Sequence, residues 1–242
     1  MLLQANKLRA LELETLTVVT EIGSFGRLSE LRAAAAAAKT RINEYKGPIN
    51  INLGFVLDIR LRADRRAELV PRRVDIGALV QVDETDTITN ASYSVIICRT
   101  NEPARSPIVR KVHFDYQPVA LRNRNEPKPT VHMQLCGKFS PHHHAAGYND
   151  ERLRALYPDF EKPRIPTAPT SIALILNWLL LEFQTDAASE AILRDKRWRT
   201  HVAYAERLVL TPYFEKAVRF LQSTADEKRR FLQTHLYELV GD

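Results

Sequence analysis

The stretch from residue 109 to residue 144, VRKVHFDYQPVALRNRNEPKPTVHMQLCGKFSPHHH, holds five of the seven histidines and one of the two cysteines. It contains two similar strand-like segments, VHFDY at 112–116 and VHMQL at 131–135. Because successive side chains of a strand point to opposite faces, each segment has one apolar and one polar face. If the two strands are neighbours, their shared polar face carries a group of polar residues that we predict to be the functional site. These residues are His113, Asp115, His132 and Gln134.

Three segments further upstream show the same alternation of apolar and polar residues, at 53–61, 74–82 and 91–97. Turn-rich connections such as DETDT and NEPARSP separate the strand-like segments. Clean alternation is typical of an antiparallel sheet with one face on the core, and not of a parallel sheet covered on both faces. The sequence therefore predicts a five-stranded antiparallel meander sheet within the region 47–160.

The first 46 residues have the pattern of a helical unit. Apolar residues recur at three-four spacing along 8–25 and again along 28–45, and the glycines at 23 and 26 interrupt the pattern. A helical hairpin and a single kinked helix both fit this interruption. We expect the two stripes to pack within the chain, and a homodimer through these N-terminal helices is the alternative.

The region 161–242 has the pattern of a C-terminal helical region that follows a proline-rich segment at 161–169. The segment Ile172–Phe183 is apolar on every side, so we predict a buried helix at the centre of a bundle. Amphipathic helices are predicted at 194–210 and 212–221, and the residues TADE at 224–227 form a capping box for a last helix. The predicted fold is α+β, with the helical unit, the sheet and the bundle packed as one compact domain.

Composition sets the broad class of the protein. The chain has 242 residues, of which 45% are hydrophobic and 26% charged, which is ordinary for a globular protein. Two cysteines are too few for a disulfide framework, and neither a secretory leader nor an apolar run long enough to span a bilayer is visible. We therefore expect a cytoplasmic location.

The charge distribution is compatible with an acidic partner. The formal net charge is +6, and residues 106–167 hold ten Lys and Arg against six Asp and Glu. A solvated basic surface would explain this excess, and so would binding to RNA, DNA or an acidic protein. The candidate nucleic-acid-binding residues are Arg60, Arg62 and Lys111 on the polar sheet face and the nearby Lys138. Our leading hypothesis is a microbial binding or interaction protein that engages nucleic acid or another acidic partner through this face.

The paired histidines suggest a second hypothesis, a small endoribonuclease of the toxin or defence kind. Two imidazoles near neutral pKa suit general acid–base cleavage of RNA, and a carboxylate can orient one of them. The catalytic residues would be His113 and His132, with Asp115 orienting a ring. The alternative is a polar sheet face whose histidines only bond their neighbours. The chain has no phosphate-binding glycine loop, GxSxG elbow or HExxH motif, which argues against an ATPase, a kinase or a serine hydrolase.

Two readings of Cys136 complete the candidates. With His113, His132 and one of the residues 142–144 it would complete a tetrahedral zinc site, but this spacing matches no standard zinc motif, and we predict no metal and no cofactor. The order of a helical unit, a meander, a cysteine and further helices is similar to that of ubiquitin-conjugating enzymes and their RWD relatives. This resemblance implies a nucleophilic cysteine, yet the His-Pro-Asn motif of that family is absent from this chain.

Overall fold

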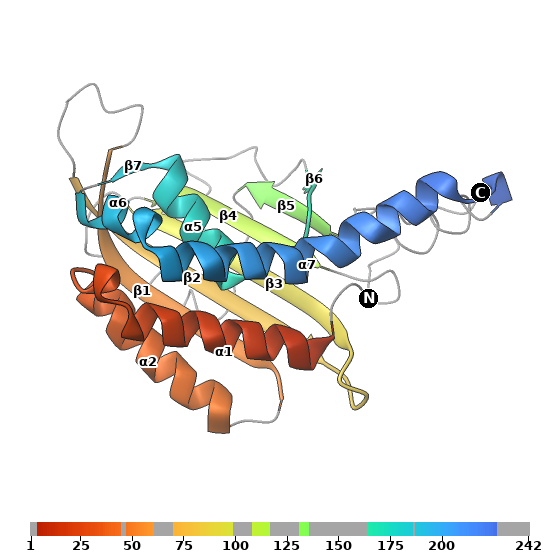
Figure 1. The fold of residues 1–242 in the computed structure, drawn as a ribbon, viewed down its shortest axis with the longest axis horizontal. Helices are drawn as coiled ribbons and strands as arrows, with labels where there is room; N and C mark the ends of the chain where they lie inside the picture. The colour runs from red at the N-terminus through yellow and green to blue at the C-terminus, as the bar shows by residue number, and fades with distance from the viewer. Residues whose placement is uncertain are drawn as a thin grey trace.

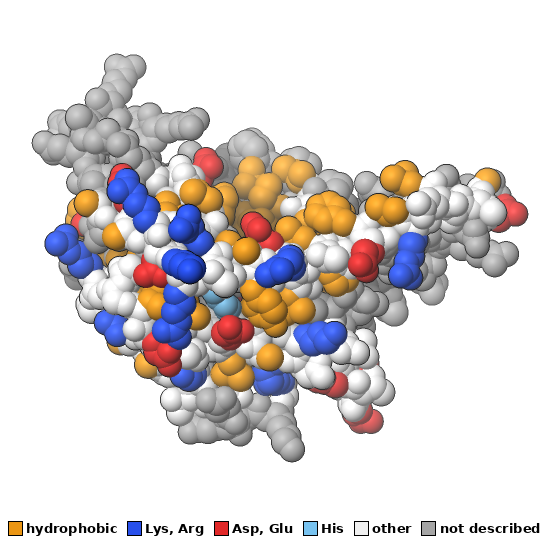
Figure 2. Space-filling view, viewed as in Figure 1, with side chains coloured by type: hydrophobic (Ala, Val, Ile, Leu, Met, Phe, Trp, Pro, Cys, Tyr) orange, Lys and Arg blue, Asp and Glu red, His pale blue; other side chains and the backbone are white. Residues whose placement is uncertain are grey.

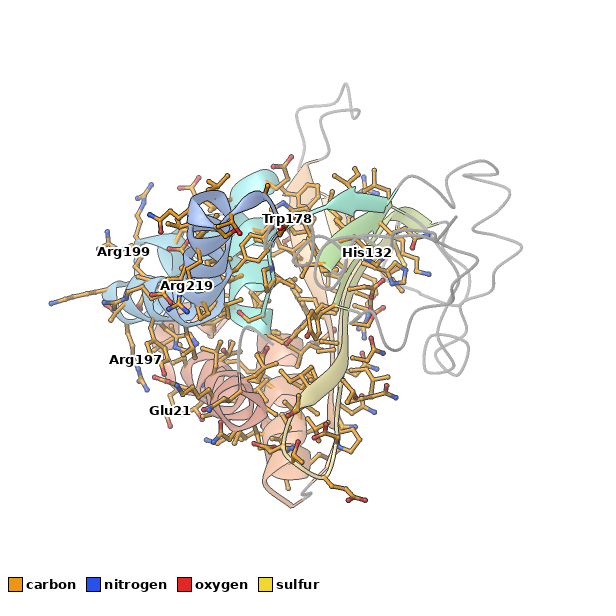
Figure 3. The ribbon with its side chains drawn as sticks, turned by 90° about the vertical axis from the view of Figure 1, so that its right-hand side faces the viewer. Glu21, His132, Trp178, Arg197, Arg199 and Arg219 are labelled. Atoms are coloured by element: carbon orange, nitrogen blue, oxygen red, sulfur yellow. The ribbon has the colours of Figure 1, made fainter. Side chains whose placement is uncertain are left out.

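In the computed structural model the protein has an α+β architecture in which helices cover one face of an antiparallel sheet (Figure 1). The structure describes residues 4–44, 47–60, 70–98, 108–116, 131–135, 164–185 and 187–226. Viewed from the side, the sheet and the helical layer lie next to each other as two layers (Figure 3). The α+β prediction is confirmed.

All five predicted strands are present, and each pairs antiparallel with the next, as the meander prediction requires. They are β1 (Ile49–Arg60), β2 (Val70–Val82), β3 (Ile88–Cys98), β4 (Ile108–Tyr116) and β5 (Val131–Leu135). Two short strands that we did not predict extend the edges. β6 (Arg164–Pro166) pairs with β5, and β7 (Gln184–Thr185) pairs with the end of β1. Proline is compatible with an edge strand, because an edge strand has one side free of ladder hydrogen bonds.

The N-terminal unit is a hairpin of two helices, α1 (Ala5–Glu21) and α2 (Ser29–Glu44), joined by a short 3-10 turn, η1 (Gly23–Phe25). Ile22 has an extended backbone and ends α1. The described apolar residues of both predicted stripes belong to the common core, in which Leu28 is partly buried, and residue 45 lies outside the described residues. The stripes are therefore covered within the chain, and a homodimer through these helices would need a different surface.

Gly54 of β1 leaves room for an ion pair between β2 and α2. Arg73 lies on the outer face of β2, and its guanidinium contacts Asp75 at 3.1 Å and Glu30 of α2 at 3.0 Å. To reach α2 the side chain passes over Gly54 of β1, where a Cβ atom would overlap the guanidinium. The missing side chain at position 54 thus allows an ion pair that crosses a whole strand.

The C-terminal helices are α5 (Ile172–Glu182), α6 (Ala187–Arg194) and α7 (Lys196–Gln222). Our prediction of two helices at 194–210 and 212–221 is wrong, because α7 continues through Pro212. A proline removes one helical hydrogen bond and favours a kink, but it does not oblige the chain to leave the helix. The predictions for 224–239 fall almost entirely outside the described residues.

The apolar helix α5 is buried on one side only. Six of its residues belong to the core, whereas Leu181 is 65% exposed. The prediction that α5 is buried on every side is therefore wrong for its outward face. Among the described helices, none is long and apolar enough to cross a bilayer.

One hydrophobic core joins the inner face of the sheet to α1, α2, α5, α6 and α7. The fully buried Trp198 of α7 packs edge-on against Phe25, with ring centroids 5.2 Å apart. Its indole N–H donates to Asn177 Oδ1 at 3.2 Å, so the polar atom of this core residue is satisfied. The helical units from both ends of the chain thus share one core with the sheet.

Candidate functional site

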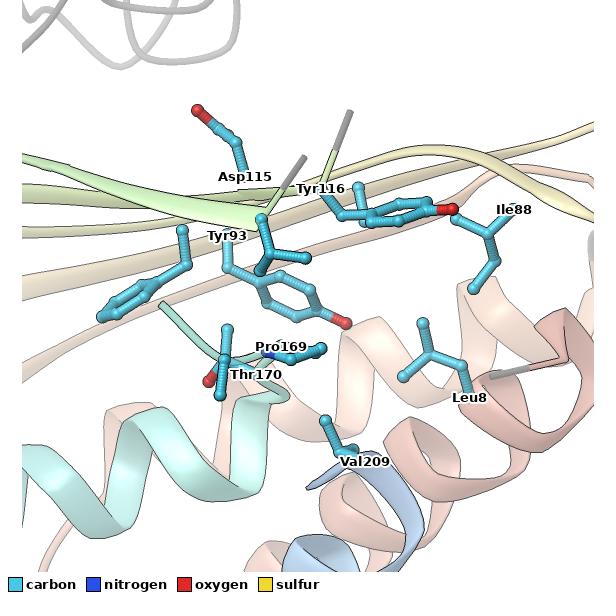
Figure 4. Close-up of a pocket in the computed structure, with 12 residues that line it drawn as sticks. Leu8, Ile88, Tyr93, Asp115, Tyr116, Pro169, Thr170 and Val209 are labelled. Carbon is cyan, nitrogen blue, oxygen red and sulfur yellow. The ribbon is translucent and has the colours of Figure 1, made fainter. Parts of the chain in front are cut away.

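The predicted polar residues of β4 and β5 do share the outer face of the sheet, together with two serines of β3. The register places them in two rows across three strands: Ser92, Asp115 and His132 in one, and Ser94, His113 and Gln134 in the other. Figure 4 shows the Asp115 side chain pointing away from the helical layer, opposite to Tyr93. The period-two pattern of the sequence therefore assigned these side chains to the correct face.

Within the first row, Asp115 makes contacts on both sides. The Ser92 hydroxyl donates to Asp115 Oδ1 at 2.6 Å, and His132 Nε2 lies 3.6 Å from Asp115 Oδ2. A distance of 3.6 Å is too long for a hydrogen bond, so the second contact is electrostatic and is strongest when the imidazole is protonated. Asp115 is thus placed next to one histidine, as a carboxylate that orients an imidazole would be.

The two histidines are not directly opposite each other. His113 faces Gln134 and His132 faces Asp115, so the histidines are diagonal neighbours on adjacent strands. For such a diagonal pair the Cα atoms are about 7–8 Å apart. An acid–base pair acting on one phosphodiester requires both imidazoles to reach the substrate, and this depends on their exposure.

Exposure argues against a catalytic role for the cluster. The side chain of His132 is 1% exposed, and that of Lys111 on the same face is 2% exposed. A buried imidazole cannot touch an RNA phosphate, and a buried ammonium cannot offer a surface contact to nucleic acid. The cluster is better described as a part-buried polar network, in which Ser92 donates to Asp115 and Asp115 lies beside His132.

The structure does not describe the side chains of the remaining predicted site residues. Arg60 ends β1, but its side chain is not described, and Arg62, Lys138, Cys136 and residues 142–144 lie outside the described residues. Within the described ranges, no group of three or more His, Cys, Asp and Glu residues is placed to hold a metal ion. The other cysteine, Cys98, is buried at the end of β3.

A second polar cluster, which the sequence analysis missed, lies in the helical layer. Glu12 of α1 has no exposed surface, and its carboxylate accepts from the Tyr93 hydroxyl at 2.9 Å and from the backbone N–H of Ile172 at 3.2 Å. Ile172 is the first residue of α5, and the partial positive charge at the N-terminus of this helix favours a carboxylate. Burial nevertheless raises the pKa of Glu12 to about 7, against the smaller lowering effects of these two hydrogen bonds.

The signal for Glu12 was present in the sequence. It lies between Leu11 and Leu16, one turn after Leu8, and therefore on the apolar stripe of the predicted helix. A carboxylate on an apolar helical face must be either paired or protonated in the folded protein. Sequence reasoning can find such a residue, but it cannot name Tyr93 and Ile172 as its partners.

A third buried polar contact joins α7 to α1. His201 Nε2 lies 2.9 Å from Thr15 Oγ1, and Thr15 already donates its hydroxyl hydrogen to the carbonyl of Leu11. Nε2 must then be the donor, which assigns the tautomer of the neutral ring. Burial lowers the pKa of His201. The neutral imidazole is therefore the form that the fold favours.

A small cavity lies beside Tyr93, between the sheet and the helical layer (Figure 4). Its walls come from α1, β3, β4, β5, α7 and the segment before α5, and they are almost entirely apolar. The cavity has a volume of about 50 Å³. An apolar cavity of about 150 Å³ holds a single benzene molecule. The space beside Tyr93 is therefore a packing void and too small for a substrate.

The exposed positive charge of the described helices is concentrated where α6 meets α7. We call this region the α6–α7 basic surface and define it as Arg194, Lys196, Arg197 and Arg199, all of which are exposed. Figure 3 shows Arg197 and Arg199 projecting from the helical layer, away from the sheet, and Figure 2 shows Lys and Arg side chains gathered in a column on this face. The surface comes from the sequence run RDKRWR, which our sequence analysis did not single out.

Local structure holds these side chains outward. Asp195 caps α7 by accepting from the backbone N–H of Arg197 at 2.8 Å and of Trp198 at 3.2 Å, and its other oxygen accepts from Ser24. Because Trp198 is anchored in the core, its neighbours on the helix must point elsewhere. Arg194 pairs with Glu190 and Arg197 with Glu21, whereas no ion pair of Lys196 or Arg199 occurs within the described part of the chain.

Comparisons with protein-family models, with curated proteins and with solved structures find no match to this chain. Its function must therefore be argued from its own residues.

Proposed function

We propose that this chain is a binding protein that engages nucleic acid through the α6–α7 basic surface. The observation that carries the proposal is the exposure of four cations within six consecutive residues, two of them without an ion pair among the described residues. Cations held outward by a rigid, capped helix suit the phosphate backbone, which supplies most of the affinity in sequence-independent binding. The net charge of +6 adds long-range attraction.

This proposal keeps the partner expected from the sequence but moves the contact surface. The sheet face was the expected surface, and the burial of Lys111 and His132 weakens that part of the hypothesis. The helical layer offers its cations to solvent (Figure 2). Of the two surfaces, it is therefore the one that suits a phosphate backbone better.

The test is a binding titration of labelled RNA and DNA at several salt concentrations. Neutralising two cations of the surface, in the variant Lys196→Gln/Arg199→Gln, should lower the slope of log K against log salt by about 2. The control Lys7→Gln/Arg41→Gln removes the same charge from exposed positions at the far ends of α1 and α2 and should leave the slope nearly unchanged. An equal loss in both variants would show that only net charge matters, which contradicts the proposal. If neither nucleic acid binds, an acidic protein becomes the better candidate partner.

A histidine-dependent ribonuclease is the second candidate. The contact of Asp115 with His132 at 3.6 Å supports it, and the burial of His132 opposes it. Incubating the labelled RNA with the wild-type chain, with and without EDTA, separates the two functions. Cleavage that survives EDTA but disappears in both His113→Ala and His132→Ala would favour the enzyme. Binding without cleavage favours the proposal above.

A further inference from the structure

The C-terminal half of α7 exposes an apolar stripe. Phe214 is 55% exposed, Val218 50% and Leu221 69%. Their spacing of four and three residues places them on one side of the helix. A large apolar residue that is exposed alone needs no explanation, but three on one helical stripe indicate an interaction surface.

The position of this stripe makes it available to a partner. Figure 1 shows α7 extending past the edge of the sheet, so its C-terminal half is not packed against the described strands. A stripe formed by residues 214, 218 and 221 is narrow, which is the form that pairs one helix with another. The partner that fits is therefore a second helix.

The charges beside the stripe indicate which helix that is. Glu215 and Arg219 are exposed on the same flank of the stripe, one turn apart. When two copies of a helix pair antiparallel about a twofold axis, the same flank of each copy meets the other. With the axis near position 217, Glu215 of each copy lies opposite Arg219 of the other. The flank is thus complementary to itself in one orientation, and the twofold operation makes this ion pair twice.

A groove at the base of the stripe is consistent with the same arrangement. An open groove of about 400 Å³ runs between the N-terminus of α1 and the middle of α7. Its lining residues are mostly polar and consist of Gln4, Lys7, Arg207, Leu208, Thr211, Pro212 and Glu215. Because Glu215 is one of these residues, the groove lies on the flank of α7 that meets the second copy in the antiparallel pair.

We propose that the chain forms a homodimer in which the C-terminal halves of two α7 helices pack antiparallel through Phe214, Val218 and Leu221. The apolar stripe supplies the affinity. The two Glu215–Arg219 pairs select the antiparallel orientation, since exposed ion pairs add little stability but suppress wrong pairings. The dimer does not depend on the nucleic-acid proposal, because the α6–α7 basic surface lies at the opposite end of α7.

The first test measures the molar mass of the full chain by light scattering and sedimentation over a wide concentration range. The mass should rise from that of the 27.7 kDa monomer towards twice that value as the concentration increases. Val218→Asp should weaken dimerisation at least tenfold, because it places two carboxylates in the contact. Leu181→Asp is the matched control, since it adds the same charge at an exposed apolar residue of α5, and it should leave the dimer intact. A wild-type chain that stays monomeric, or equal effects of the two variants, would overturn the proposal.

The second test uses the charges. Glu215→Arg alone and Arg219→Glu alone should each give a monomer, because each places like charges opposite one another across the twofold axis. An equimolar mixture of the two variants should form a heterodimer, since the two cations of one chain then face the two anions of the other. The double variant Glu215→Arg/Arg219→Glu should again form a homodimer. Because these positions are exposed, circular dichroism should show that every variant keeps its helix content. Failure of the mixture to associate would overturn the antiparallel arrangement.

Discussion

Two neighbouring residues of β3 donate hydrogen bonds to two carboxyl groups on opposite sides of the sheet, and the surroundings of these two groups differ. Ser92 points to the outer face and donates to Asp115, whereas Tyr93 points to the helical layer and donates to Glu12. Asp115 has a histidine beside it and keeps some contact with solvent. Glu12 has no cation among its described hydrogen-bonding partners and no exposed surface, and its pKa is raised to about 7.

The comparison shows that two hydrogen bonds do not replace water around a carboxylate. Glu12 accepts from a hydroxyl and from the N-terminus of a helix, and desolvation still outweighs both. A buried carboxyl without a cation is therefore protonated through much of the range below neutral pH. Asp115 lies on the other face of the same sheet. It is partly exposed, so it keeps some of its hydration, and the imidazole of His132 lies beside it.

The largest predicted effect concerns Glu12 and pH. Because the folded pKa, about 7, exceeds the ordinary value of 4.5, the folded state favours the protonated carboxyl. Its stabilising effect is complete below about pH 4.5 and is lost as the pH rises through 7, by about 3 kcal/mol in the free energy of unfolding. In Glu12→Gln the amide oxygen can still accept hydrogen bonds from Tyr93 and Ile172, and the side chain does not titrate. The loss of stability with rising pH should therefore disappear. Denaturant unfolding at pH 5, 6, 7 and 8 measures it.

His201 acts in the opposite direction and must be separated from Glu12 in that experiment. Its folded pKa is lowered below 6.5, so the folded state favours the neutral ring, and stability is lost as the pH falls below 6.5. His201→Gln should remove this loss at low pH and leave the decline above pH 6 unchanged. If Glu12→Gln and His201→Gln alter the same part of the pH profile, the assignment to two groups is wrong.

A smaller effect is expected for the histidine beside Asp115. His132→Ala removes a buried ring and leaves Asp115 without its imidazole neighbour, which should lower the free energy of unfolding by about 2–3 kcal/mol. His132→Asn retains polar atoms in the site and should cost less. Thermal and urea unfolding at pH 6 measure both. If His132→Ala leaves the free energy of unfolding unchanged, the outer-face network adds no stability. A structural role would then not explain these polar residues.

The smallest effects compare the two donors of β3 directly. Ser92→Ala and Tyr93→Phe each delete one hydroxyl and should each cost about 1 kcal/mol near neutral pH. Tyr93→Phe should cost more at pH 8, because it leaves an ionised Glu12 with one donor fewer, and less at pH 5, where Glu12 is protonated. Ser92→Ala should show no comparable change between these two values. Parallel pH profiles of the two variants would contradict the distinction between the two carboxylates.

The sequence alone determined the properties that depend on local chain geometry. Alternation of period two found the five central strands and assigned His113, Asp115, His132 and Gln134 to one face, because successive strand residues must point to opposite sides. Three-four spacing and the two glycines likewise identified the N-terminal helices. Short strands such as β6 and β7 escaped prediction, since two or three residues show no periodicity.

Tertiary structure alone decided which of these residues are buried and which partners they meet. Ser92 and Asp115 are 23 residues apart in the chain, and Glu12 and Ile172 are 160 apart. Cross-strand register set the first contact, and the packing of α1 beside the start of α5 set the second. The burial of His132 and the exposure of the α7 stripe also depend on how distant segments pack. Periodicity tells which way a side chain points, but the free energy of burying it depends on neighbours that only the folded chain brings together.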